Sequence, residues 1–176
     1  MRVHSGVFSL LVLTGCVDAN DPDAGPKEDL QLQTTGTPTV GASTTELTIP
    51  SGVVTKISLA GESWDVGGMH STTSNPSRLI APVDGIYQVS ATISWRASSA
   101  GTQRYVTFRK PGGSDLALSQ VAPVKSPSYF TTQVVSAHVK LAAGEYIEPY
   151  VFQDTGASLN VVVGSHVEMA WIAAGI

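Results

Sequence analysis

The sequence predicts an all-β protein, an antiparallel two-sheet jelly-roll sandwich preceded by an extended N-terminal arm. Apolar and polar residues alternate strictly through residues 87–96, a period of two that a helix does not produce. The 176 residues include 17 Gly, 10 Pro, 20 Ser and 17 Thr, a composition typical of short strands joined by many turns. Charged residues make up only 14%, and no segment has the apolar spacing of an amphipathic helix.

The segment 86–96 has the clearest pair of strand faces. Polar residues alternate with an apolar set made of Tyr87, Val89, Ala91, Ile93 and Trp95. An apolar face of this kind packs against a second sheet about 10 Å away. Similar patterns between Gly-, Pro- and Ser-rich turns predict further strands at 53–59, 103–110, 115–121, 131–141, 146–153, 159–163 and 166–172.

Several of these strands are apolar on both faces, although a sandwich strand needs only one apolar face. Val134 lies next to Val135, and Val161 to Val163 are consecutive. The last strand has apolar residues in both phases as well, from Val167 to Ile172. The second apolar face has to be covered, and another copy of the chain is the simplest cover.

Charge divides the chain into an acidic leader and a neutral body. Residues 1–50 carry six acids and two bases, whereas residues 51–176 carry eight of each. We expect an apolar leader at 1–16, an acidic linker or arm rich in Pro, Gly and Thr at 17–45, and a jelly-roll head at 46–176. A neutral head offers little electrostatic opposition to self-association.

The leader has two interpretations. Arg2 precedes the apolar run Val7–Leu13, and Thr14-Gly15-Cys16 follows, an arrangement that resembles a bacterial lipoprotein signal. In that interpretation Cys16 is the lipidated first residue and residues 17–45 are a tether. In the other, the run is an uncleaved arm that docks on a partner. The sequence leaves both interpretations open.

Composition argues against several classes of function. Cys16 is the only cysteine, which excludes an intrachain disulfide and a multi-cysteine zinc site. No apolar stretch reaches the roughly 18 residues of a membrane-spanning helix. A net charge of −4 without a basic cluster argues against nucleic-acid binding. No cofactor or metal is expected, because the four histidines are dispersed: His4, His70, His138 and His166.

Enzymatic activity is not predicted either. The sequence has no Gly-x-Ser-x-Gly nucleophile motif and no phosphate-binding loop. Glu145 and Glu148 could in principle serve a carbohydrate-active enzyme as its two carboxylates, but they belong to a turn and the strand after it. Nothing places them across a cleft, so this remains a third hypothesis from a different class.

Three segments of the body carry a family resemblance: residues 78–87 (RLIAPVDGIY), 139–146 (VKLAAGEY) and 167–172 (VEMAWI). In order, they resemble the Pro-x-x-Gly-x-Tyr strand entry, the Leu-x-x-Gly-Asp-x-Val turn and the last strand of one family. That family is the complement C-one-q globular head, which shares its jelly roll with tumour necrosis factor. Glu145 stands where the family usually has Asp, and the resemblance covers about residues 44–176.

Four loop segments, 62–65, 68–70, 74–78 and 153–160, look like the variant of this family found in bacteria and their phages. That variant usually ends virion fibre, decoration or tail proteins. The resemblance implies a non-enzymatic homotrimer whose last strand lines the threefold axis. The interface residues it implies are Val135, Val167, Met169 and Trp171.

The expected function is that of a trimeric surface module, most simply a bacteriophage virion protein such as a capsid decoration, head fibre or tail tip. Residues 1–45 would dock on capsid or tail proteins, and the head would face solvent at the virion surface and bind a host-surface glycan or protein. The alternative is a bacterial cell-surface lipoprotein that displays the same head from Cys16. Trp64, Asp65 and His70 are the candidate ligand-binding residues, because an indole in a loop can stack on a sugar ring.

Overall fold

The structure, a computed structural model, describes residues 39–174 and is built from strands over that range. Within it, no helix is long and apolar enough to cross a membrane. The strands, in chain order, are β1 Thr39–Ala42, β2 Leu47–Ile49, β3 Thr55–Lys56, β4 Gly61–Asp65, β5 Leu79–Ile80, β6 Gly85–Trp95, β7 Arg104–Arg109, β8 Asp115–Val121, β9 Thr131–Leu141, β10 Tyr146–Gln153, β11 Leu159–Val161 and β12 His166–Ala173.

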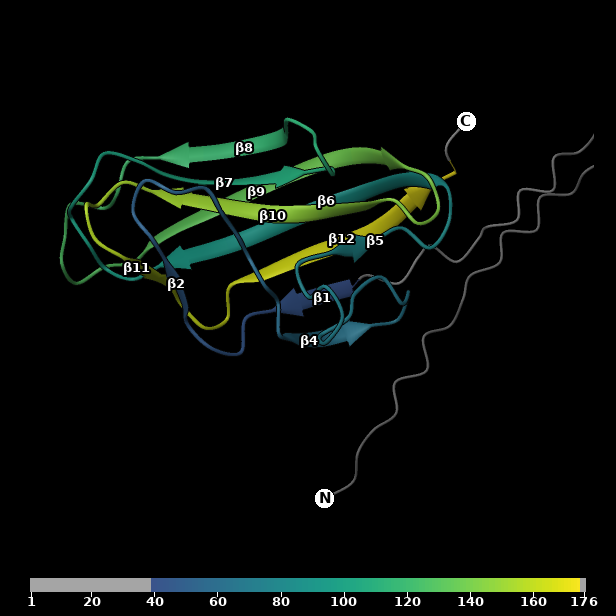
Figure 1. The fold of residues 1–176 in the computed structure, drawn as a ribbon, viewed down its shortest axis with the longest axis horizontal. Coiled ribbons are helices and arrows are strands. Elements are labelled where there is room, and N and C mark those ends of the chain that lie inside the picture. Colours follow the sequence, from purple (N-terminus) through teal and green to yellow (C-terminus); the bar gives the residue numbers. More distant parts are fainter. Residues whose placement is uncertain (1–38, 175–176) are drawn as a thin grey trace, which may run out of the picture. The chain divides into compact units, whose positions relative to one another are not determined.

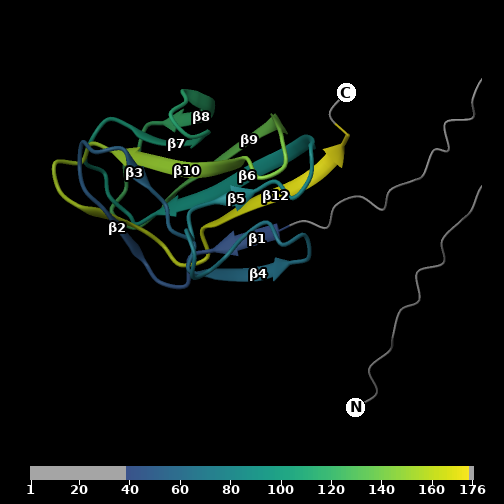
Figure 2. The same cartoon turned by 45° about the vertical axis from the view of Figure 1, so that its right-hand side comes forward.

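The strands form two antiparallel sheets that pack face to face (Figures 1 and 2). The seven-stranded sheet, called sheet A below, has the order β2-β11-β6-β12-β1-β4, with β9 paired to the other edge of β6. The five-stranded sheet, called sheet B, has the order β3-β10-β7-β8, with β5 beside β10. The predicted all-β, two-sheet jelly-roll sandwich is confirmed.

The long strands lie where the periodicity predicts them, and the segment 53–59 is the main exception. Only Thr55–Lys56 pairs with a neighbour, because the next residue, Ile57, meets Pro149 of β10. Ile57 donates its N–H to the Pro149 carbonyl, but proline has no N–H to continue the ladder. The apolar residues of this segment nevertheless enter the core, with Ile57 and Leu59 each 1% exposed.

The sheet begins earlier than the predicted head boundary at residue 46. Strand β1, which falls in the predicted linker at 17–45, lies between β12 and β4 in sheet A. Gly41 allows this, because a Cβ atom there would lie 2.8 Å from Leu59 Cδ1. The leader at 1–16 and the linker up to residue 38 lie outside the described residues, as does Cys16.

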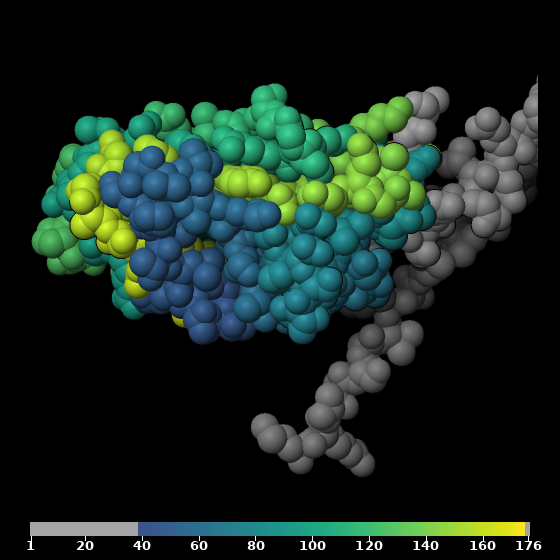
Figure 3. Space-filling model, in the orientation of Figure 1, coloured from purple at the N-terminus to yellow at the C-terminus, as the bar shows by residue number. Residues whose placement is uncertain are grey.

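The chain from β2 to Ala81, just after β5, lies along the β10 edge of sheet B. In Figure 3 this blue-to-teal segment lies against β10, which runs across the same face in yellow-green. Backbone hydrogen bonds fix the contact, from Ile57 to Pro149 and from Ala81 to Glu145.

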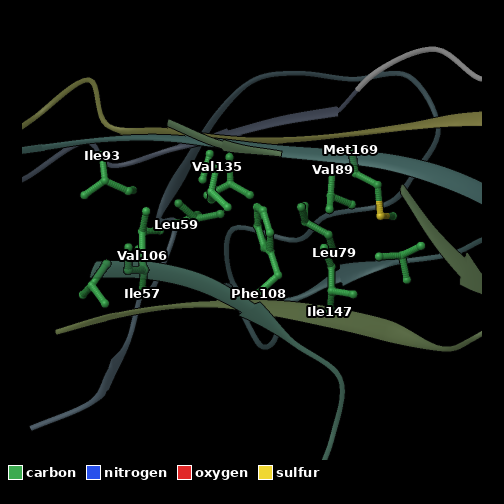
Figure 4. Packing of buried hydrophobic residues seen from close by; sticks show 14 of the residues in the cluster. Ile57, Leu59, Leu79, Val89, Ile93, Val106, Phe108, Val135, Ile147 and Met169 are labelled. Atoms are coloured by element: carbon green, nitrogen blue, oxygen red, sulfur yellow. The ribbon is translucent and has the colours of Figure 1, made fainter. Parts of the chain in front are cut away.

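The core fills the space between the sheets. Side chains from both inner faces interdigitate there, among them Val89 and Met169 from sheet A and Phe108 and Ile147 from sheet B (Figure 4). A buried polar bridge also crosses the core. The Trp95 indole N–H donates to Gln133 Oε1 at 2.9 Å, and Gln133 Nε2 donates to the carbonyls of Arg104 and Ser119 in sheet B.

The predicted interface residues lie mostly in this core. Val167 and Met169 are 0% exposed and Val135 is 6% exposed, so they pack inside one chain and cannot line a contact between copies. The prediction took the wrong phase of strands β9 and β12, since a shift of one residue turns a strand's side chains to the other face. Trp171 is half-buried, and its ring lies over Gly85, where a Cβ atom would be 2.2 Å from Nε1.

The Tyr87 hydroxyl holds residues 82–87 at the start of β6, and its contribution to stability can be tested. Its side chain is fully buried, and its hydroxyl donates to the Val83 carbonyl at 2.7 Å and accepts from the Val83 N–H at 3.4 Å. Tyr87→Phe should lower the free energy of unfolding by about 1–3 kcal/mol, because both Val83 groups lose their partner. Denaturant unfolding measures the loss, with Tyr129→Phe, at a 69% exposed position, as the control that changes little. Equal stability of the two variants would show that the hydroxyl contributes nothing.

Candidate functional site

Two of the three predicted ligand-binding residues hold the loop after β4 in place. The Asp65 carboxylate accepts hydrogen bonds from the backbone N–H groups of Met69 and His70, at 2.9 and 3.0 Å, and from Thr39 Oγ1 at 2.6 Å. Burial raises the pKa of Asp65, but these hydrogen bonds together lower it by more than burial raises it. The pKa of Asp65 therefore lies below its ordinary value. Asp65 therefore ties the loop to β1 as a carboxylate.

His70 has a similar structural role. Its side chain is fully buried, with Nδ1 3.1 Å from Glu62 Oε2 and Nε2 3.1 Å from the Pro76 carbonyl. Both ring nitrogens are engaged, so His70 has no atom free for a ligand. The prediction that Asp65 and His70 contact a ligand is thus not supported by their surroundings. Trp64 remains, with 51% of its surface exposed.

Trp64 lies on the outer face of sheet A, where strand register arranges side chains in rows. One row crosses five strands and consists of Trp64, Val40, Glu168, Ser90 and Ser136. The next row consists of Ala42, His166, Thr92 and Val134. The two rows run side by side across the sheet, and both reach β4.

A surface cleft of about 260 Å³, open to solvent, lies at the β4 end of these rows. It is lined by Val40, Ala42, Ser63, Trp64, Gly164, His166 and Glu168. Val40 is only 6% exposed although it belongs to the outer face, so it forms an apolar floor beside the indole. We call this the Trp64 cleft.

The polar wall of the Trp64 cleft comes from β12. Glu168 Oε2 accepts a hydrogen bond from Ser90 Oγ at 3.1 Å, while Oε1 lies 3.5 Å from His166 Nε2. His166 Nδ1 lies 3.0 Å from the Gly164 carbonyl and donates to it, because a carbonyl can only accept. The wall therefore presents a carboxylate oxygen and an imidazole nitrogen side by side.

Sequence reasoning missed His166 and Glu168 as site residues. They alternate with the buried Val167 and Met169, so their positions in the polar phase of β12 were the available signal. What the sequence did not show was that β4 pairs with β1 and so brings Trp64 to the same face.

Glu148, one of the two carboxylates considered for a glycosidase, lies in a cluster of cations on sheet B. Glu148 Oε1 is 3.0 Å from Lys56 Nζ and 3.2 Å from both Arg78 Nε and Ser77 Oγ, and Oε2 accepts from Tyr150 at 3.1 Å. Burial raises the pKa of Glu148, but the hydrogen bonds from Lys56 and Arg78 contribute to a net lowering.

Glu145 lies outside that cluster. It accepts from the Ala142 N–H at 2.9 Å and from Lys110 Nζ at 3.1 Å, and these contacts lower its pKa. A glycosidase needs one carboxyl held protonated by a raised pKa. With both pKa values lowered, Glu145 and Glu148 are suited to ion pairing and not to that role.

A metal centre is not formed by the described part of the chain. Over residues 39–174, no group of three His, Cys, Asp or Glu side chains could hold an ion. His70 is buried in the loop after β4, whereas His138 is exposed on β9 and His166 lines the Trp64 cleft. His4 lies outside the described residues.

A second notable surface is the side of the sandwich where β8 and β9 lie together. Six exposed large hydrophobic residues occur between residues 116 and 134, namely Leu116, Leu118, Val124, Tyr129, Phe130 and Val134, each 38–69% exposed. Arg96 lies over the Phe130 ring at 5.5 Å. We call this surface the β8–β9 edge.

Comparison with known proteins identifies the architecture. No protein-family model matches the chain, and no curated protein matches it. The solved structure of Eiger TNF from S. frugiperda superposes on the chain with a TM-score of 0.59. The superposition covers 96% of the Eiger chain and 81% of this chain. The chain has a tumour necrosis factor-like fold. At 14% sequence identity the likeness establishes the fold alone, so the expected bacterial and phage variant stays a prediction.

The Glu148 cluster of this TNF-like head generates a pH-dependent prediction. Glu148→Gln should lower the free energy of unfolding at pH 7 by about 2–3 kcal/mol, because Lys56 and Arg78 lose a nearly buried counter-charge. Since the pKa of the folded carboxyl is lowered, its stabilisation is present above the unfolded pKa, about 4.3, and is lost as the pH falls through the folded value.

Denaturant unfolding of wild type and variant at several pH values measures this difference. The two curves should converge in acid and separate towards neutral pH. Glu145→Gln, at an exposed ion pair, is the control and should cause a much smaller loss. A difference that stayed constant from pH 3 to pH 7 would contradict the role assigned to the Glu148 charge.

Proposed function

We propose that the protein is a non-enzymatic homotrimeric surface module and that its setting is a bacteriophage virion. The observation that carries the trimer is the β8–β9 edge, where large hydrophobic residues are exposed along two edge strands and the loop between them, on a chain whose body has no net charge over residues 51–176. Exposed large hydrophobic residues along one edge of a sandwich favour association with a partner. The TNF-like fold supports the same proposal.

A ring of three copies joins two different surfaces of each chain. The β8–β9 edge is one of them. For the other we propose the central rows of sheet A's outer face, on β6 and β12, where Ser90, Thr92 and Ala170 are short and let a neighbour approach closely. Each edge then covers the face of the next copy, and the ring closes after three.

The virion setting rests on the loop segments that look like the phage variant and on the acidic, Pro-rich segment before the head. The part of the predicted arm that precedes β1 docks on capsid or tail proteins in this proposal, and the head faces solvent at the virion surface. The second candidate is a bacterial lipoprotein anchored through Cys16, which the Leu-Thr-Gly-Cys pattern favours.

Light scattering on the full chain tests the trimer. At micromolar concentration the mass should be about three times the 18.3 kDa of one chain. Val134→Asp and Leu118→Asp should each shift it to the mass of a single folded chain, because an unpaired carboxylate in the contact costs several kcal/mol. Val53→Asp, at a 50% exposed position outside the proposed contact, should stay trimeric. A single-chain wild type, or trimers in both edge variants, would overturn the proposal.

Intact mass and fractionation separate the two settings. A docked arm keeps residues 1–15 and co-sediments with virus particles. A lipoprotein loses residues 1–15, gains acyl chains on Cys16 and fractionates with membranes, and Cys16→Ser then releases it. The virion setting predicts that Cys16→Ser still gives the intact, unacylated chain and leaves its fractionation unchanged.

A further inference from the structure

We propose that the Glu148 cluster on sheet B binds the carboxylate of an acidic sugar residue, such as a uronic acid, in a cell-surface glycan. This inference rests on the proposed function as a surface-displayed module and names the class of ligand that such a module takes. The residues that carry it are Lys56 and Arg78, whose two charges share the single carboxylate of Glu148.

The Glu148 cluster has one more cation than it has carboxylates. Lys56 Nζ and Arg78 Nε lie 3.0 and 3.2 Å from the same oxygen, Glu148 Oε1. In every other ion pair of residues 39–174, one carboxylate is paired with one basic side chain. Two positive charges held this close repel each other, so an anion between them is attracted by both. A carboxylate offsets the single excess charge, whereas a doubly charged phosphate exceeds it.

Both cations keep hydrogen-bond donors for such an anion. An ammonium group has three N–H donors and a guanidinium group has five. Within the described part of the chain, Lys56 Nζ and Arg78 Nε each donate to Glu148 Oε1, and the two Nη groups of Arg78 have no acceptor. The Lys56 and Arg78 side chains are 43% and 31% exposed, so a ligand from solvent can reach these donors.

The guanidinium of Arg78 is held in position before any ligand arrives. Its Cζ lies over the Tyr146 ring at 4.1 Å while its Nε donates to Glu148. Two parallel N–H groups of a guanidinium match the two oxygens of a carboxylate. Because a group that is fixed in advance loses little entropy on binding, Arg78 is suited to receive a carboxylate.

An apolar side chain beside the cations favours a sugar ring as the carrier of that carboxylate. Ile80 of β5 pairs with Tyr146 of β10, so their side chains share a face of the sheet, and Arg78 lies over the Tyr146 ring. Ile80 is 37% exposed. The C–H groups of a pyranose ring can contact this aliphatic surface while the carboxylate reaches the cations.

The Glu148 cluster stays accessible in the proposed ring of three copies. That ring covers the β8–β9 edge and the central rows of sheet A's outer face. Lys56 lies on β3 and Glu148 on β10, and β7 separates both strands from β8 in sheet B. Arg78 directly precedes β5, which also lies beside β10. The cluster therefore lies on neither of the two covered surfaces.

Nuclear magnetic resonance of the backbone amides tests the proposal in the full chain. The probe is methyl β-glucuronide at pH 7 and low ionic strength, raised to about 100 mM because single sugars bind at millimolar affinity or weaker. Methyl β-glucoside has the same ring without the carboxylate. Glucose 6-sulfate and glucose 6-phosphate carry other anions, and N-acetyl aspartic acid amide presents the carboxylate of a peptide.

We expect methyl β-glucuronide to shift the amide signals of Lys56, Arg78 and Tyr150 in a saturable way, with every comparison compound binding more weakly. Lys56→Met should weaken binding about tenfold, because it removes the excess charge and its hydrogen bonds. Lys125→Met is the matched control and should bind as wild type, since Lys125 is an exposed cation whose ammonium group contacts the carbonyls of Ser99 and Gly101 instead.

Glu148→Gln provides a test of opposite sign. It removes the carboxylate that competes with the ligand and keeps both cations, so binding of methyl β-glucuronide should tighten about tenfold. The titration is made at a temperature where denaturant unfolding shows that this variant is folded. A cluster with a purely structural role predicts no tightening. Lys56→Met carries the test alone if Glu148→Gln does not fold.

Four results would overturn the site: no saturable shift with methyl β-glucuronide, a comparison compound that binds at least as tightly, unchanged binding in Lys56→Met, or weaker binding in a folded Glu148→Gln. Light scattering on the same samples separates these outcomes from failure of the proposed function. A monomer that binds methyl β-glucuronide refutes the trimer alone, and a trimer that does not bind it refutes the site alone.

Discussion

Alternate burial along β6 is the constraint on which the rest of the structure depends. This strand is 11 residues long, and its odd-numbered residues from Gly85 to Trp95 are all buried. It pairs along its whole length with β9 on one side and with β12 and β11 on the other. Because paired residues share a face, the phase of β6 decides which residues of those neighbours enter the core and which form the outer face. Core and surface of sheet A are thus two results of one pattern.

The sequence was sufficient for the fold and for the long strands, since β6, β9 and β10 carry their own periodic signal. It was not sufficient for β1, β4 and β5, which have two to five residues each and exist because a neighbour pairs with them. The end of pairing after Lys56 also depended on a distant residue, because Pro149 cannot return a hydrogen bond. Local pattern cannot show which segment a short strand will meet.

The candidate site followed the same rule. Trp64 was predicted from its type and loop position and does line a cleft, whereas Asp65 and His70 were assigned to the ligand and instead hold the loop. Short polar loops contain residues that can contact a ligand and residues that hold the loop in place, and only their hydrogen-bond partners distinguish the two kinds. Three of the four residues predicted for the interface, Val135, Val167 and Met169, lie on the core face of their strands. Because β9 and β12 are apolar on both faces, the sequence offered no way to choose between the faces.

Strand register has a consequence for the use of this head as a scaffold. Thr39 pairs with Met169, so the first and last described strands begin and end at the same pole of sheet A. The connections 96–103, 122–130 and 154–158 lie at the opposite pole, beyond Trp95 and Gln153 (Figure 1). A circular permutant that joins the two neighbouring ends and opens one of those connections would reverse the polarity of display. Peptides grafted into the same connections would project away from whatever holds the chain at its ends.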